Sequence, residues 1–298
     1  MPIKELKLDL MPLIKKMEIF TKKKIQSGLT GRYASAFKGR GLEFEGYGPY
    51  SITEDASTID WKASLRSDEI LVKKFVVERS LYTFFLLDVS NSMLFASINK
   101  LKAEYAAEFV AVLSFAILQA GDNVGVAMFT DRIEKEVRPN MGRKQYFEII
   151  RALSNPQFYG GKYDLEFVLK YALNSLKRRS VVIIVSDFLG LKGNWKRWLR
   201  IATEKFDVIA MIIRDPRDFV IPKNTGPIVI ADPYSKQELL INPREVADSF
   251  EETAKKRYRE LIDTFKDMRI DHLTLMTNED FVGKITKFFV RREQMKRR

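Results

Sequence analysis

Apolar runs of strand length alternate with amphipathic segments of helix length from residue 80 to the end of this 298-residue chain. Two of these runs are Leu81–Asp88 (LYTFFLLD) and Val181–Asp187 (VVIIVSD), and each ends in an aspartate. A strand that is apolar at almost every position is buried on both faces, as happens where helices cover both sides of a parallel sheet. The alternation therefore predicts a doubly wound, mostly parallel α/β fold.

Further segments complete the predicted sheet and its helices. Three more apolar runs fit buried strands: Asn123–Phe129, Asp207–Ile213 and His272–Met276. Apolar residues spaced by three and four positions predict helices over 101–119, 143–153, 164–177, 195–203, 244–267 and 280–291. Arg132–Arg138 is polar and alternating, which favours an antiparallel strand at the sheet edge. A turn signal at Asp232–Ser235 predicts a hairpin insertion over residues 228–241.

The first 79 residues follow a different pattern. Apolar side chains recur with helical spacing in the first thirty residues, and a stretch rich in glycine and aromatic residues follows. This stretch predicts a short strand near Leu42–Phe44, a helical turn around Ile59–Ser64 and an extended segment near Ile70–Val77. We expect Asp60 to cap the turn and Trp61 to lock this region onto the sheet. The chain therefore divides into a small N-terminal α+β subdomain, 1–79, and an α/β domain, 80–298.

Several classes of protein are excluded by what the chain lacks. It has no cysteine, which excludes disulfides, zinc thiolate sites and cysteine nucleophiles. No apolar run approaches the ~18–20 residues that a membrane span needs, and the first residues have no uninterrupted apolar core of a signal peptide. No Walker A pattern occurs, so the chain is not itself a P-loop ATPase. These features predict a cytoplasmic protein without a membrane span.

Polar side chains follow two of the predicted buried strands. Asp88, Ser90 and Ser92 alternate directly after the first strand, and Asp187 ends another. Ligands of α/β sheets bind beyond the carboxyl ends of the strands, so we expect these four side chains to meet there at an exposed rim. Their hard oxygen atoms suit Mg²⁺, Mn²⁺ or Ca²⁺ and not zinc or copper. Aspartate and serine after a strand are also common helix caps, which is the structural alternative.

Two motifs together indicate a family. DVSNSM followed by VSDFLG resembles the metal-ion-dependent adhesion site of von Willebrand factor type A domains. The segment GRGLEFEGYGPYSITEDASTIDWKASLRSDEILVKKFVVERS is similar to the signature of the domain-of-unknown-function 58 family. The resemblance implies a von Willebrand factor type A-like fold. It also implies that Asp88, Ser90, Ser92 and Asp187 are the residues of the metal site.

The chain departs from the family pattern in one loop. The family has a G-G-T-D-L sequence that supplies a threonine ligand, whereas this chain reads GGKYDL from Gly160 to Leu165. The threonine is absent, one residue is inserted, and the ammonium of Lys162 would repel a cation if it pointed inward. Lys162 either points outward or itself stands in for the cation.

The function that the resemblance implies is recognition without catalysis. Mg²⁺ or Mn²⁺ held mainly by hydroxyls and water keeps much of its charge and binds an Asp or Glu of a partner protein. Proteins that look like this one often accompany MoxR-type AAA+ ATPases and are thought to act as adaptors. The residues assigned to partner contact are Asn91, Gly161, Lys162 and Asp164.

Two other classes of function stay open. The first is a magnesium-dependent phosphohydrolase with Asp88 as nucleophile, although such enzymes usually have a second acid where this chain has Ser90. The second is nucleic-acid binding, since Lys284–Arg298 holds seven Lys or Arg and one Glu in a chain of formal net charge +12. A solvated basic helix end explains this tail equally simply. The single histidine, His272, fits a packed strand better than a catalytic base.

Overall fold

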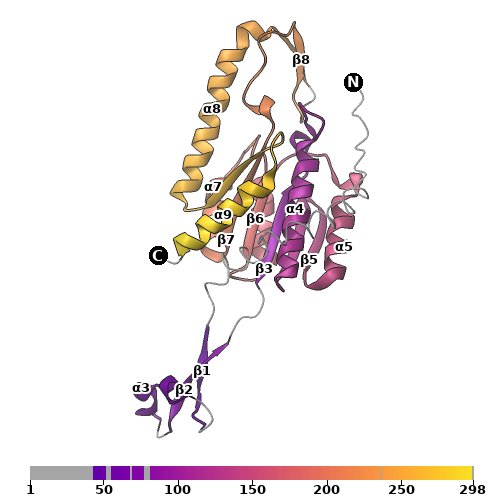
Figure 1. The fold of residues 1–298 in the computed structure, drawn as a ribbon. Helices are drawn as coiled ribbons and strands as arrows, with labels where there is room; N and C mark the ends of the chain where they lie inside the picture. Colours follow the sequence, from indigo (N-terminus) through magenta and orange to yellow (C-terminus); the bar gives the residue numbers. More distant parts are fainter. Residues whose placement is uncertain (1–42, 52–54, 68, 77–80, 236, 297–298) are drawn as a thin grey trace.

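The computed structural model describes residues 43–51, 55–67, 69–76, 81–235 and 237–296 (Figure 1). Within them lie a six-stranded sheet with helices on both faces and two separate two-stranded sheets. The helix predicted for the first thirty residues and the subdomain boundary predicted at residue 79 lie outside the described residues.

The central sheet has the strand order β10-β7-β6-β3-β4-β5. All neighbours are parallel except β5, which runs antiparallel to β4 at the sheet edge. The strands are β3 (Tyr82–Asp88), β4 (Asn123–Phe129), β5 (Ile133–Asn140), β6 (Val181–Ser186), β7 (Asp207–Arg214) and β10 (Asp271–Met276). This topology confirms the predicted mostly parallel α/β sheet with its antiparallel edge strand.

Alternate residues of β3 point to two different layers of helices. Phe85 and Leu87 pack in one hydrophobic core, beneath α4 (Lys102–Gln119), α5 (Gly142–Leu153) and α9 (Phe281–Lys296). Phe84 and Leu86 pack in the other, beneath α6 (Leu165–Ser175), α7 (Trp195–Lys205) and α8 (Pro243–Asp267). The strand is apolar at successive positions because both of its faces are buried.

The described N-terminal residues form a small antiparallel sheet that Figure 1 shows apart from the central one. Strand β1 (Glu43–Pro49) pairs with β2 (Leu71–Val76), and η1 (Ala56–Thr58) and α3 (Trp61–Ser64) lie between them in sequence. The Asp60 carboxylate caps α3 by accepting hydrogen bonds from the Lys62 and Ala63 amides, as expected. The expectation for Trp61 is wrong, because its side chain is 63% exposed and packs on no core.

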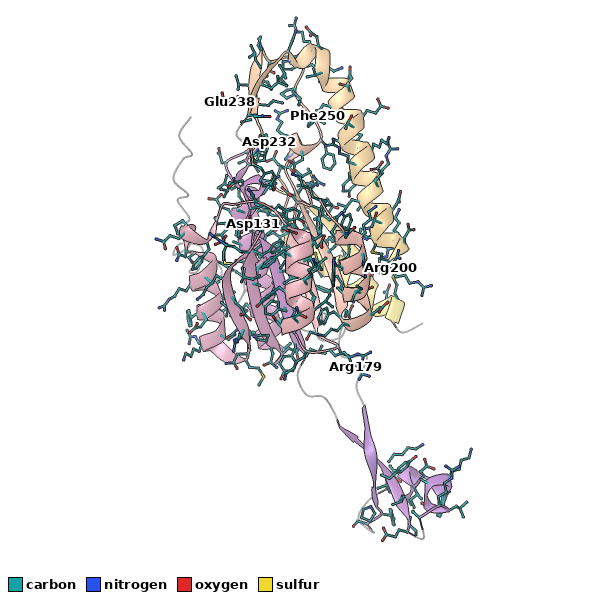
Figure 2. All side chains as sticks on the ribbon, turned by 180° about the vertical axis from the view of Figure 1, so that it is seen from behind. Asp131, Arg179, Arg200, Asp232, Glu238 and Phe250 are labelled. Carbon is teal, nitrogen blue, oxygen red and sulfur yellow. The ribbon has the colours of Figure 1, made fainter. Side chains whose placement is uncertain are left out.

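A second hairpin lies within the predicted insertion. Strands β8 (Ile228–Ala231) and β9 (Glu238–Ile241) pair antiparallel, and α8 follows them directly. Figure 2 places Asp232 and Glu238 of this hairpin beyond the end of the sheet where Asp131 lies, and Arg179 at the opposite end. Asp131 follows β4, so the hairpin stands at the carboxyl ends of the parallel strands. In the part of the chain that the structure describes, no helix has the length and apolarity needed to cross a membrane.

Candidate functional site

The two aspartates predicted from sequence come from neighbouring strand ends. Asp88 is the last residue of β3, and Asp187 follows β6, which pairs with β3 in parallel register. The hydroxyl of Ser186, which precedes Asp187, donates a hydrogen bond of 2.6 Å to Oδ2 of Asp88. The sheet therefore brings the two predicted motifs together, although they are about a hundred residues apart in the sequence.

The loop after β3 turns both serines toward this place. The Ser90 amide donates to Oδ1 of Asp88 at 2.9 Å, and the hydroxyls of Ser90 and Ser92 lie 3.3 Å apart. Ser92 lies in η2 (Asn91–Leu94), a short helix that directly follows the strand end. The four residues predicted as a metal site thus form one cluster at the carboxyl edge of the sheet.

A lysine that we did not single out from the sequence completes the cluster. The Nζ atom of Lys102, the first residue of α4, donates to Oδ2 of Asp187 at 2.7 Å and to Oδ1 of Asp218 at 3.2 Å. The Lys102 side chain is only 1% exposed. A sequence signal existed, because Lys102 shares a helix face with Ala106 and Phe109, which are spaced as a buried stripe. Lys162, the lysine that we considered, is exposed.

Burial changes the acid-base behaviour of these groups. Burial, together with the charge of Asp187, raises the pKa of Asp88 to about 7, although hydrogen bonds from Ser186 and Ser90 oppose the shift. Burial alone would lower the pKa of Lys102. The carboxylates of Asp187 and Asp218 outweigh it and hold this pKa above its usual value. Lys102 is therefore charged at neutral pH, while the pKa of Asp88 is raised toward neutral pH.

The expectation of an exposed rim is wrong, because Asp88, Ser90 and Asp187 are fully buried. The turn between β8 and β9 covers them. Tyr234 in this turn places its hydroxyl 3.4 Å from the Ser90 hydroxyl, and the Asn91 side chain donates to the Pro233 carbonyl at 2.8 Å. A sequence pattern could not show this cover, since Ser90 and Tyr234 are 144 positions apart.

The glycine loop closes the cluster from another side. The Gly161 amide donates to Oδ1 of Asn91 at 2.8 Å, and the Asn91 amide donates to the Gly161 carbonyl at 3.0 Å. Gly161 has φ of +130°, and a Cβ there would lie 3.0 Å from the Thr130 side chain, so this close approach needs glycine. Asp164 caps α6 by accepting from the Phe167 amide at 2.9 Å. Of the four residues assigned to partner contact, Lys162 is exposed and the other three are half-buried.

The arrangement does not fit a resident divalent cation. Both oxygens of Asp88 and both oxygens of Asp187 accept hydrogen bonds, the latter from the Leu189 amide at 2.8 Å and from Lys102. A cation bound to Asp187 would also meet the Lys102 ammonium at close range. Among the described residues no three carboxylate or histidine side chains are grouped as metal ligands are.

The geometry gives little support to the two alternative functions, phosphoryl hydrolysis and nucleic-acid binding. A phosphoryl nucleophile must reach its substrate, and Asp88 is fully buried. The basic C-terminal helix uses Arg292 inside the fold, where its guanidinium forms ion pairs with Asp207 and, at 3.3 Å, with Asp271. His272 packs 5.8 Å from the Phe265 ring, centroid to centroid, and its Nδ1 lies 3.0 Å from the Ile270 carbonyl. It lies in β10, three strands away from β3.

Comparisons with known proteins include uncharacterised relatives and distant structures. An uncharacterised protein of Mycobacterium bovis is 26% identical over 285 residues, which cover 94% of this chain and 89% of the relative. An aerotolerance-related membrane protein from Bacteroides fragilis has 14% identity and a TM-score of 0.49, covering 72% of this chain and all of that one. A von Willebrand factor type A protein from Catenulispora acidiphila has 12% identity and a TM-score of 0.35. The match covers 76% of this chain and 43% of that one.

A family model matches most of the chain. The match runs over residues 47–260, which include the strand-end cluster and the hairpin of β8 and β9. This is more than half of the 298 residues. The chain therefore belongs to the family described as protein of unknown function DUF58.

Proposed function

We propose that this chain is a protein-interaction module without catalytic activity, and that it serves as an adaptor for a MoxR-type AAA+ ATPase. The observation that carries the proposal is the hairpin of β8 and β9, which exposes apolar side chains at the carboxyl edge of the sheet. Val229, Leu239 and Leu240 are 59%, 61% and 68% exposed. An apolar surface of this kind is typical of a place where another protein binds.

The hairpin offers apolar contacts on both of its faces. Val229 pairs with Leu240 across the strands, and Ile230 pairs with Leu239. Cross-strand partners share a face and successive residues alternate, so the two pairs point to opposite sides. A two-stranded ribbon with both faces in water is marginally stable by itself, and a partner that covers either face would stabilise it.

The turn of the hairpin connects this surface to the strand-end cluster. Asn91 and Ser90, from the loop after β3, contact Pro233 and Tyr234 in the hairpin turn. Lys162 is exposed in the glycine loop, whose Gly161 amide donates a hydrogen bond to the Asn91 side chain. We propose that Lys162 pairs with an Asp or Glu of the partner. The acidic contact that the resemblance implies would then form at the surface, outside the buried cluster.

The test is a binding measurement with the purified MoxR-type ATPase from the same genome. We expect Val229→Ser combined with Leu240→Ser to weaken binding by tenfold or more, since burying each of these side chains contributes about 1–2 kcal/mol. Met141→Ser is the matched control, because Met141 is also exposed and apolar but lies at the start of α5. Equal effects of the two changes would exclude the hairpin, and an ATPase that does not bind the wild-type chain would refute the adaptor role.

A second measurement separates the acidic contact from the apolar one. Lys162→Ala should reduce the association rate and make binding less dependent on salt, because a rim charge mainly steers the encounter. Lys192→Ala is a suitable control for net charge, since Lys192 is exposed in the loop before α7. If the two changes have the same effect, Lys162 has no specific acidic partner.

A further inference from the structure

We propose that the ammonium of Lys102 is the built-in cation of the strand-end cluster, in the place where the family resemblance implies a divalent metal ion. The cluster is then assembled and held closed without metal. This inference depends only on the residues of the cluster, and it stands or falls independently of any ATPase partner.

The position of Lys102 is costly unless the residue has this role. Its side chain is 1% exposed, and it lies on the buried face of α4 that also carries Ala106 and Phe109. Lysine is almost never fully buried in proteins unless it is paired, because desolvation penalises an isolated ammonium heavily. An apolar residue would complete this helix face at lower cost. A lysine here indicates that the cluster needs a positive charge.

The contacts of Lys102 link separate segments, as a metal ion does. Its Nζ donates to Asp187 after β6, at 2.7 Å, and lies 3.2 Å and 3.3 Å from the two oxygens of Asp218. Asp218 ends η4 (Pro216–Asp218), the short helix that follows β7. The three donors of one ammonium thus connect α4 with the ends of two parallel strands.

The carboxylates around Lys102 extend this linkage to the loop after β3. Oδ2 of Asp218 also accepts from the Asp215 amide at 2.9 Å. Oδ2 of Asp215 accepts from the Ser97 amide at 2.9 Å, and Ser97 lies in the segment between η2 and α4. A cation at the Lys102 position therefore links the segment around Ser97, which follows η2, to the end of β7.

A divalent ion at Asp187 would compete with the Lys102 ammonium, which already contacts this carboxylate. Oδ1 of Asp187 accepts from the Leu189 amide, Oδ2 accepts from Lys102, and both oxygens of Asp88 accept from Ser90 and Ser186. Binding a metal to Asp187 would place two positive charges side by side in a buried site. Either the ammonium leaves or the metal stays out, and the helix that carries Lys102 is packed into the core.

The first test uses the wild-type chain and needs no variant. Magnesium or manganese chloride is titrated while heat release and thermal unfolding are followed. We expect no binding heat and no rise of the unfolding midpoint up to millimolar concentrations, because a resident ion would stabilise the chain by mass action. Sub-millimolar binding that Asp88→Asn abolishes would overturn the proposal.

The second test removes the charge and keeps the length of the side chain. Lys102→Met should lower the unfolding midpoint by about 10 °C, since it leaves two buried carboxylates without their cation. Lys100→Met is the matched control, because Lys100 forms an ion pair of the same 2.7 Å length with Glu108 but is 37% exposed. The unfolding midpoint of the Lys100→Met variant should change by about 2 °C or less. Similar changes in the two variants would contradict the proposal.

A third variant distinguishes lost charge from lost packing. Asp187→Asn added to Lys102→Met removes one of the unpaired carboxylates, so the double variant should regain part of the lost midpoint. A double variant that is less stable than Lys102→Met would show that Asp187 has no need of this cation and would refute the proposal. Both outcomes are read from unfolding alone.

Discussion

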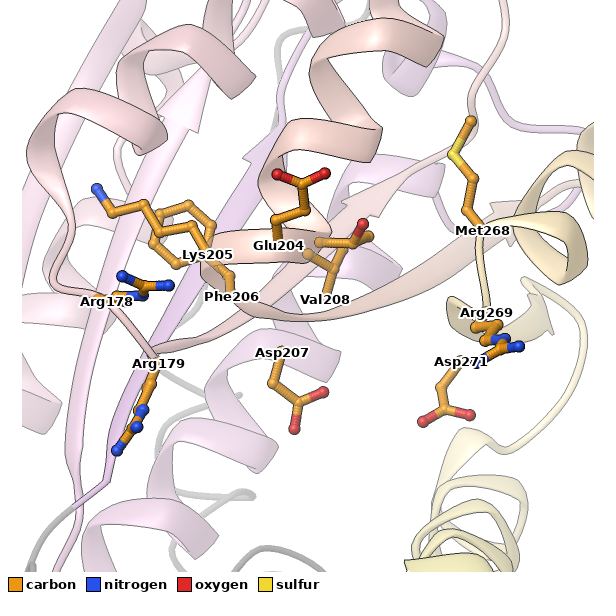
Figure 3. A pocket seen from close by; sticks show the side chains of 11 residues that line it. Arg178, Arg179, Glu204, Lys205, Phe206, Asp207, Val208, Met268, Arg269 and Asp271 are labelled. Carbon is orange, nitrogen blue, oxygen red and sulfur yellow. The ribbon is translucent and has the colours of Figure 1, made fainter.

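The two ends of the central sheet differ in how far their charged side chains are exposed to solvent. At the carboxyl end, Asp88, Asp187 and Lys102 are buried beneath loops that are hydrogen-bonded to one another. At the amino end lies an open cleft of about 640 Å³, lined by Arg178, Arg179, Arg269 and other side chains (Figure 3). This open cleft therefore lies at the opposite end of the sheet from the buried, paired charges of the strand-end cluster. In Figure 3 its arginines spread around the cleft and do not converge on a point.

The difference follows from solvation. Water screens the exposed charges that line the open cleft, so an ion pair between exposed side chains there contributes about 0–1 kcal/mol. At the closed end, water is excluded and each buried charge needs a partner, so the loss of one partner costs several kcal/mol. Substitutions at the two ends should therefore differ strongly in their effect on the free energy of unfolding, and the predictions below order them by size.

The largest effect is expected for Asp187→Ala. It leaves the buried ammonium of Lys102 with Asp218 alone, and breaking a buried pair from one side costs about 3–5 kcal/mol. Urea unfolding monitored by circular dichroism measures the loss. If the free energy of unfolding falls by less than about 1 kcal/mol, the carboxyl end of the sheet behaves like the amino end, and the distinction between the two ends is wrong.

The next effect is a dependence of stability on pH. Burial raises the pKa of Asp88 from 3.8 to about 7, so between these values the folded chain keeps a proton that the unfolded chain has released. The stability that this group contributes is complete below about pH 4, falls as the pH rises to about 7, and stays constant above. The fall amounts to up to about 4 kcal/mol.

Urea unfolding at a series of pH values measures this fall. Asp88→Asn cannot ionise and should flatten the curve across the same window. If the slope persists in this variant, another buried group causes it, and the closed end contains a titrating residue other than Asp88.

A smaller effect is expected at the loop junction. Asn91→Ala removes the hydrogen bonds to the Gly161 amide and the Pro233 carbonyl, and it should cost about 1–2 kcal/mol. Hydrogen exchange should also become faster at the amides of Asp232, Tyr234 and Ser235, because their link to the strand-end loop is lost. Unchanged exchange there would show that Tyr234 alone holds the hairpin turn in place.

The smallest effect is expected at the amino end. Asp271→Ala removes a carboxylate that is 40% exposed and lies 3.3 Å from the Arg292 guanidinium, which also pairs with Asp207. The loss should stay within about 1 kcal/mol. A loss as large as that of Asp187→Ala would erase the distinction between the two ends.

Much of the fold could be predicted from the sequence, because the spacing of apolar residues in a strand or helix indicates which of its faces are buried. The run NVGVAMF was expected over 123–129 and forms β4 with the same bounds. The antiparallel edge strand and the two acid-ended strands were also predicted, and the sheet brings Asp88 and Asp187 to neighbouring ends. Local patterns determine these features, so they can be seen without knowledge of the tertiary structure.

The closure of the site could not be predicted in the same way. Which distant segment covers a strand end depends on how loops pack, and neither Tyr234 nor Pro233 has a local pattern that points to Ser90 or Asn91. Lys102 is an intermediate case. Its helix face was visible in the sequence, but its partner Asp218 lies 116 positions away and became evident only in the fold.

The place of the hairpin in the chain has a consequence for variation. Strands β8 and β9 enter between β7 and α8, and neither strand pairs with the central sheet. Their outer residues can therefore be exchanged, or the hairpin lengthened, without altering the order of the six strands. Under the proposed function, members of the family can keep one scaffold and diverge in what they recognise, and we expect a hairpin transplanted between two of them to carry its binding preference with it.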